Sequence, residues 1–265
     1  MNFLKKREKQ LPELTVVVCT FNQESTVVET LNSVMSQQVD FPIQILVHDD
    51  CSTDNSLIAI YKTLANSPFP YKVLSPKINQ YQFGMDFFYN LFADIETKYI
   101  AVCDGDDLWT DPLKLQKQIQ VLEADSKIKI CHHKFDVVDM KSDDYLYSWP
   151  PEVFRRNFLP GTELAKENFI GTCAVVFRRD SLPKRIAGYS RLGIGDYPLW
   201  GLIAQDSPIA FVDESMAKYR LHPDQVYANK EASEKNEIIR EVKLFVAQNT
   251  TGGVSEVWKK FARLI

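Results

Sequence analysis

Two kinds of hydrophobic pattern alternate along residues 14–105. Short, continuous apolar runs predict buried strands, because a strand covered on both faces has no polar side to show. Between these runs, apolar residues recur at helical spacing, which predicts amphipathic helices. The alternation indicates an α/β fold built from parallel βαβ units wound right-handedly. Strands are expected at 14–19, 43–47, 71–74 and 99–103, and helices at 25–37, 54–64 and 84–93.

After Asp107 the pattern changes, and strands and helices no longer alternate regularly. Pro112 opens an amphipathic helix, and residues 128–138 predict one long strand or a strand pair. The segment 145–161 is rich in proline and aromatic residues, so we expect a loop there that forms a lid over an acceptor site. Further strands are expected at 171–178, 209–212 and 216–221, a helix at 197–204, and helices from 231 onward with a break at 250–253.

Composition narrows the class of protein. Of the 265 residues, 45% are apolar and 12% aromatic, which supports a sizeable core and excludes disorder. A net charge of -4 argues against nucleic-acid binding, since phosphate contacts need clustered Lys and Arg. No apolar stretch approaches the roughly 20 residues of a membrane span, and the basic segment 1–10 lacks the apolar core of a signal peptide. The cysteines are odd in number and form no CxxC pair, so we expect reduced thiols in the cytoplasm.

Polar clusters follow three of the predicted strands: Thr20-Phe21-Asn22, Asp49-Asp50, and Asp104-Gly105-Asp106-Asp107. Ligands of open α/β sheets bind at the carboxyl ends of the strands, so we expect these clusters to meet there. The chain has no glycine-rich phosphate loop. A divalent cation would relieve the repulsion among the last three carboxylates and provide a contact for a diphosphate, and oxygen ligands favour Mg²⁺ or Mn²⁺.

Five short segments, taken in order, resemble the inverting glycosyltransferases of family 2, which have the GT-A fold. They are Val16-Val17-Val18-Cys19-Thr20-Phe21-Asn22, Val47-His48-Asp49-Asp50-Cys51-Ser52-Thr53-Asp54, Asp104-Gly105-Asp106-Asp107 followed by Pro112, Gly195-Asp196-Tyr197-Pro198-Leu199-Trp200, and Tyr219-Arg220-Leu221-His222. The resemblance covers roughly residues 13–226. It implies a GT-A domain over 13–226 with a nucleotide-binding half (13–110) and an acceptor-binding half (111–226). An N-terminal extension (1–12) and a helical C-terminal tail (227–265) flank it.

The resemblance also implies a role for individual residues of the donor site. Thr20, Phe21 and Asn22 line the nucleotide pocket, and Asp50 accepts a hydrogen bond from the base edge, most often of uracil. Asp104, Gly105 and Asp106 form the DxD motif, in which Asp106 is the metal ligand and Asp104 faces ribose or metal-bound water. His222 closes over the metal or the diphosphate.

Asp196 occupies the place of the family's catalytic base. Two positions depart from the family pattern. Gly195 stands where many members have Glu, and Cys51 replaces the usual glycine after the Asp-Asp pair. Simpler interpretations of the acidic residues exist, since Asp also favours turns and helix N-caps.

The expected reaction is transfer of a sugar from a nucleotide sugar, with UDP the expected nucleotide, to a hydroxyl of a glycan or lipid-linked acceptor in surface polysaccharide synthesis. Two alternatives stay open: a nucleotide-sugar-binding protein that has lost catalysis, and a receiver-type phosphoacceptor module centred on Asp50. In the tail, apolar residues from Val254 to Ile265 alternate with Lys259, Lys260 and Arg263. This pattern predicts either peripheral contact with the inner face of the plasma membrane or packing on the domain or on the second subunit of a homodimer.

Overall fold

The computed structural model describes residues 11–184, 186, 188–223, 225, 227 and 229–265. The basic segment 1–10, most of the expected N-terminal extension, lies outside the described residues.

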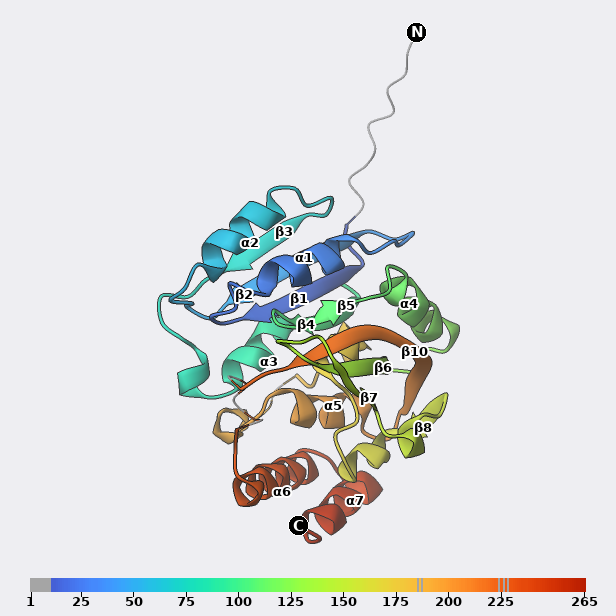
Figure 1. Ribbon diagram of the computed structural model, residues 1–265. Helices are drawn as coiled ribbons and strands as arrows, with labels where there is room; N and C mark the ends of the chain where they lie inside the picture. Colours follow the sequence, from blue (N-terminus) through green and yellow to red (C-terminus); the bar gives the residue numbers. More distant parts are fainter. Residues whose placement is uncertain (1–10, 185, 187, 224, 226, 228) are drawn as a thin grey trace.

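The core of the molecule is one mixed sheet in the order β3-β2-β1-β4-β9-β6-β10-β5 (Figure 1). The first four strands are parallel, as the alternation of strands and helices predicted. β9 is antiparallel to both β4 and β6, and so joins the two expected halves of the domain. The strands are β1 (Leu14–Thr20), β2 (Ile43–Asp49), β3 (Tyr71–Leu74), β4 (Tyr99–Asp104), β5 (Leu108–Trp109), β6 (Ile130–Asp139), β7 (Tyr145–Trp149), β8 (Phe158–Pro160), β9 (Val176–Arg178) and β10 (Pro208–Leu221).

Helices cover both faces of the sheet (Figure 1). One apolar cluster joins α1 (Val27–Met35), α2 (Ser56–Leu64) and α4 (Lys114–Ala124) to one face. A second cluster joins α3 (Asp86–Ala93), α5 (Asp196–Ala204), α6 (Ala232–Gln248) and α7 (Gly252–Ala262) to the other. Short 3-10 helices occupy Tyr81–Phe83, Glu152–Phe154, Gly161–Ala165, Thr172–Ala174, Arg179–Ser181 and Tyr189–Arg191.

In the first 105 residues, every expected strand and helix is present. The expected bounds are least accurate at the helix starts. Asp54 lies outside α2 but accepts hydrogen bonds from the backbone N–H of Ser56 at 2.9 Å and from its hydroxyl at 2.5 Å. Asp54 thus accepts one of the backbone N–H groups left free at the start of the helix, although it lies outside the helix itself. This explains why Asp54 and Ser56 were both candidates for the helix start.

Three predictions for the second half were wrong in detail. The segment 145–161 is not an irregular loop, because β7 pairs with β6 and β8 pairs with β10. The expected strand at 171–178 begins as a 3-10 turn, and only its last residues, Val176–Arg178, pair. The two strands expected at 209–212 and 216–221 are one strand, β10, whose pairing with β6 shifts register twice between Val212 and Lys218. These irregularities interrupt the apolar pattern without ending the strand.

The C-terminal tail packs on the domain. Trp258 of α7 is fully buried, and Val254, Val257 and Phe261 pack against the same apolar cluster. The apolar face that suggested membrane contact is therefore covered by the protein itself, apart from the exposed Leu264 and Ile265. None of the helices in the described part of the chain combines the length and apolar character that a membrane crossing needs.

Candidate active site

The three polar clusters meet at one edge of the sheet, as expected from the parallel strands. In the strand register, Thr20 at the end of β1 lies opposite Asp49 of β2, and Cys19 lies opposite Asp104 of β4. Residues separated by more than 80 positions in the chain are thus neighbours in space. The parallel register alone places them there.

Asn22 joins the loops that follow β1 and β2. Its side-chain oxygen accepts the backbone N–H of Thr53 at 2.7 Å, and its own N–H donates to the Ser52 hydroxyl at 2.9 Å. Asn22 and Cys51 both have positive φ, at 53° and 65°. Asparagine adopts this conformation readily, whereas at Cys51 it costs about 1–2 kcal/mol, which gives a physical reason for the family's preference for glycine there.

Asp50 is buried and holds the segment that follows β3. Its carboxylate accepts the backbone N–H groups of Gln80 at 2.6 Å and Tyr81 at 3.0 Å. The neighbouring Asp49 makes a turn instead, accepting the Ser52 hydroxyl at 2.6 Å. Each Asp50 oxygen has a second lone pair, so these bonds leave acceptor capacity for the base edge expected there.

Gly105 packs directly on the end of β1. A Cβ at this position would lie 2.9 Å from the Cβ of Thr20 and 2.4 Å from the side-chain oxygen of Gln23, so a larger residue would push the two loops apart. The Gly105 carbonyl accepts the hydroxyls of Thr26 and Thr30, both at 2.9 Å. The turn between Asp104 and Asp106 is therefore fixed by α1 and β1.

The three carboxylates of this turn have different surroundings. Asp104 accepts the Thr172 hydroxyl at 2.6 Å, while burial and the nearby Asp106 carboxylate raise the pKa of Asp104 to about 7. Asp106 lies 2.9 Å from Nε2 of His222. Asp107 is fully buried, and burial raises its pKa well above the usual range for a carboxyl.

Asp196 is the first residue of α5, where the positive end of the helix dipole favours an anion. Asn168 donates to its carboxylate at 3.2 Å. Burial raises the pKa of Asp196, and the hydrogen bonds to the carboxylate partly offset that rise. A Cβ on Gly195 would lie 3.0 Å from the ring of Phe88 and 3.1 Å from the sulfur of Met85, so close packing accounts for the glycine that departs from the family pattern.

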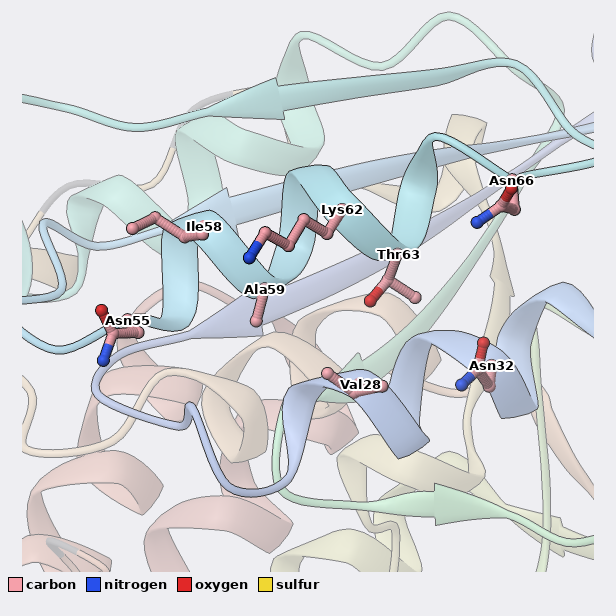
Figure 2. Close-up of a pocket in the computed structure, with 8 residues that line it drawn as sticks. All are labelled: Val28, Asn32, Asn55, Ile58, Ala59, Lys62, Thr63 and Asn66. Atoms are coloured by element: carbon pink, nitrogen blue, oxygen red, sulfur yellow. The ribbon is translucent and has the colours of Figure 1, made fainter.

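One cavity of about 700 Å³ joins Asp104 to Asp196. It is lined by polar groups, among them Thr172 and Asn168, and by many aromatic rings. A second groove, of about 610 Å³, runs between α1 and α2 (Figure 2). Its lining carries no carboxylate or imidazole: Val28, Asn32, Asn55, Ile58, Ala59, Lys62, Thr63 and Asn66. The cavity that holds Asp104 and Asp196, and also Glu167, is the candidate active site.

Sequence reasoning missed two residues that position the acidic groups. Thr172 and Asn168 come from the segment before β9 and bond to Asp104 and Asp196. Neither belongs to a recognisable motif, and Thr172 was expected to lie in a strand. Their proximity to the site depends on how the antiparallel β9 turns back beside β4.

The donor atoms at the edge of the sheet suit a hard divalent cation. Asp106 and His222 present a carboxylate and an imidazole within hydrogen-bond distance of each other, and both groups are ligands for Mn²⁺. The described residues include no group of three or more side chains that could hold a metal ion by themselves. A cation here would therefore need ligands from a bound diphosphate or water.

Residues 15–184, more than half of the chain, match the family model described as glycosyl transferase family 2. The chain belongs to this family. The resemblance drawn from the short motifs is thereby confirmed, and a receiver-type phosphoacceptor module is no longer an alternative.

Curated relatives extend the similarity beyond the family model. The chain is 31% identical over 221 residues to the uncharacterized protein Rv1520 of Mycobacterium tuberculosis (strain ATCC 25618 / H37Rv), a match that covers 81% of this chain and 60% of the relative. The chain thus spans about 60% of the length of this relative.

Solved structures of family 2 proteins confirm the GT-A fold. TarS residues 1–349 from S. aureus, in complex with UDP-GlcNAc, superimposes with a TM-score of 0.69 at 17% identity, covering 94% of this chain and 71% of TarS 1–349. The mannosyltransferase PcManGT from Pyrobaculum calidifontis, in complex with GDP-Man and Mn²⁺, gives a TM-score of 0.66 at 14% identity, covering 96% of this chain and 69% of PcManGT. At these identities the superpositions establish the fold only.

Proposed function

We propose that this chain is an inverting, metal-dependent glycosyltransferase that moves a sugar from a nucleotide sugar to a hydroxyl of a glycan or lipid-linked acceptor. The observation that carries the proposal is the single cavity in which Asp104, at the end of β4, lies together with Asp196, at the start of α5. Membership of family 2 supports the reaction class. Surface polysaccharide synthesis is the proposed role of the whole protein.

The donor is proposed to bind along the carboxyl ends of β1, β2 and β4. Thr20, Phe21 and Asn22 would line the nucleotide, and Asp50 would accept from the base. The complexes of TarS with UDP-GlcNAc and of PcManGT with GDP-Man support a nucleotide-sugar donor. We propose UDP as the nucleotide. Uracil presents an imide N–H that the Asp50 carboxylate can accept; thymine and guanine carry a comparable N–H, and the complex of TarS with UDP supports uracil among them.

Asp196 is proposed to act as the base. It would take the proton of an acceptor hydroxyl as the oxygen attacks the anomeric carbon, while the bond to the diphosphate breaks. Its partly buried position and raised pKa make it a stronger base than a fully exposed carboxylate. A single displacement of this kind inverts the configuration at the anomeric carbon.

Asp106 and His222 are proposed to hold Mn²⁺ or Mg²⁺, with Asp104 nearby. Such a cation supplies positive charge that stabilises the negative charge of the departing diphosphate. The presence of Mn²⁺ in the PcManGT complex supports this part of the proposal. Within the chain, Thr172 donates a hydrogen bond to the carboxylate of Asp104, and this bond orients the carboxylate and stabilises its ionised form.

We propose a cytoplasmic location, with which the five cysteines, none of them paired in a disulfide, agree. The proposal includes no membrane contact through the apolar face of α7, because that face packs inside the protein.

Thermal denaturation with UDP, GDP and dTDP, each with and without Mn²⁺, tests the donor site. A ligand that binds only the folded state raises the midpoint, so we expect a Mn²⁺-dependent rise that is largest for UDP. A larger rise with GDP or dTDP would refute the uracil assignment of Asp50. No rise with any nucleotide would refute the proposed function. Metal-dependent hydrolysis of a UDP-sugar then separates an enzyme from a binding protein that has lost catalysis.

A further inference from the structure

A strip of aromatic side chains runs along one face of the β6–β7 pair. In the antiparallel register, Phe135 lies opposite Trp149, and Val137 lies opposite Tyr147. Directly opposite residues of an antiparallel pair share a face, and all four of these residues line the candidate active site. Figure 1 shows β7 beside β6.

The strip begins next to the reacting groups. The ring of Phe135 lies so close to Gly171 that a Cβ there would come within 2.7 Å of it. The next residue, Thr172, donates to Asp104 at 2.6 Å. The aromatic face therefore leads from the Asp104 carboxylate toward solvent, past Trp149 to Tyr147.

Exposure separates the outer end of this strip, Trp149 and Tyr147, from the aromatic core, to which the buried Phe135 belongs. Trp109, Trp200 and Trp258 are at most 4% exposed, whereas Trp149 is only partly buried and Tyr147 is 48% exposed. The large apolar area of an exposed ring in a cavity is available to a ligand. The 700 Å³ cavity also carries the amide of Asn168 and the carboxylate of Asp196.

Flat aromatic faces beside amide and carboxylate groups match the chemistry of a sugar. A pyranose ring presents C–H groups on its faces and hydroxyls around its edge, so it can stack on a ring while its hydroxyls bond to polar groups. An alkyl chain would gain from the rings but would offer no hydrogen bond to Asn168 and Asp196 beyond the one that they make to each other. This difference favours a saccharide over a lipid tail in the cavity.

We propose that Tyr147 and Trp149 form the acceptor subsite and that the acceptor is a saccharide. Its terminal ring would stack on Trp149 with a hydroxyl toward Asp196, and the following ring would lie on Tyr147. This inference rests on the proposed function, because it takes Asp196 as the base. In this proposal the segment 145–161 provides a fixed surface on which the acceptor binds, whereas the sequence predicted a loop that forms a lid.

The same strand supplies a matched control. A register shift between Val137 and Val138 places Tyr145 opposite Val138, on the other face from Tyr147. Tyr145 is 62% exposed, and its hydroxyl lies 3.2 Å from that of Ser148. Tyr145→Ala and Tyr147→Ala thus remove the same side chain from opposite faces of one strand.

Protection of Trp149 from acrylamide quenching gives a binding readout in the full chain with UDP and Mn²⁺. The probes are methyl glycosides and trisaccharides of common hexoses, and dodecyl phosphate as the lipid-like probe. We expect at least one trisaccharide to protect Trp149, and Trp149→Phe to abolish the signal. Tyr147→Ala should weaken that protection about tenfold, while Tyr145→Ala should bind as the unmodified chain does.

Three results would overturn the inference while leaving the donor site intact. These are protection by dodecyl phosphate alone, no protection by any saccharide although UDP still raises the thermal midpoint, or equal effects of Tyr145→Ala and Tyr147→Ala. Loss of the UDP-induced rise in the unmodified chain would instead refute the proposed function. The two failures are therefore distinguishable in one set of samples.

Discussion

At the scale of single residues, burial and hydrogen bonding give neighbouring carboxyl groups different properties. Asp196 is partly buried at a helix N-terminus with an amide donor, Asp104 has a pKa of about 7, and Asp107 has no solvent exposure at all. Asp106, in contrast, is paired with His222. This division into a base and a cation site is the physical basis of the proposed reaction.

Asp196→Asn tests the base directly. The amide keeps the size and the hydrogen-bonding oxygen of the side chain but cannot take a proton, so we expect transfer to fall about 10²–10⁴-fold. UDP binding, measured by the thermal midpoint, should persist. Near-normal transfer by this variant would remove Asp196 from the role of base.

The pH dependence of transfer should report the environment of Asp196. The ionised carboxylate is the active form, and its raised pKa places the acid limb of the rate profile above the usual range for Asp. Asn168 stabilises the ionised form by donating to it. Asn168→Ala should therefore raise the pKa further and move the acid limb to higher pH, as measured by initial rates across pH. An unchanged limb would show that another group controls the profile.

At the scale of elements, the tail completes the second layer of helices. The ring of Trp258 in α7 packs over Gly201 of α5, where a Cβ would lie 2.8 Å from it, and its centroid is 5.8 Å from that of Tyr197. Tyr197 follows Asp196 in the chain. The packing of α7 on α5 thus stabilises the helix whose first residue, Asp196, is the proposed base.

Trp258→Ala should destabilise the fold. Removal of a fully buried Trp costs about 3–5 kcal/mol of unfolding free energy, measured by urea denaturation. Leu264→Ala is the control, because Leu264 is 69% exposed and should change stability by less than about 0.5 kcal/mol. Equal effects of the two substitutions would contradict the packing of α7 on α5.

At the scale of the whole molecule, one sheet brings together groups from both halves of the chain. Asp106 follows β4 and His222 follows β10, 116 positions later, yet they are hydrogen-bonded. A ligand that bridges them would tie the nucleotide-binding half to the acceptor-binding half. Binding of the donor together with the cation should therefore raise the unfolding free energy of the whole molecule.

Removal of the cation should abolish that stabilisation. At a UDP concentration of 100 times the dissociation constant, binding adds about 2.7 kcal/mol to the unfolding free energy. We expect a chelator, or Asp106→Asn in the presence of Mn²⁺, to remove most of the UDP-induced rise in thermal midpoint. Asp213→Asn changes an exposed carboxylate on β10 and serves as the control. Full UDP stabilisation of Asp106→Asn would exclude Asp106 as a metal ligand.

Much of the fold and the candidate site could be predicted from local patterns. The strands from Leu14 to Asp104 are continuous apolar runs, and the acidic clusters directly follow them. Parallel strands place their carboxyl ends at one edge, so the meeting of Asn22, Asp50 and Asp104 follows from the order of the elements. The identity of the family follows from the same short segments.

Long-range packing determined the rest, because no local pattern encodes it. Thr172 and Asn168 reach the cavity through the antiparallel pairing of β9 with β4, a strand distant in sequence, and the register shift between β6 and β7 decides which aromatic rings face the cavity. The apolar face of α7 fits a membrane, a subunit or the domain equally well as a pattern, and the structure shows that Trp258 of this face packs over Gly201 of the domain. The periodicity of a sequence indicates that a helix has an apolar face that must be covered. Only the tertiary structure shows which surface covers it.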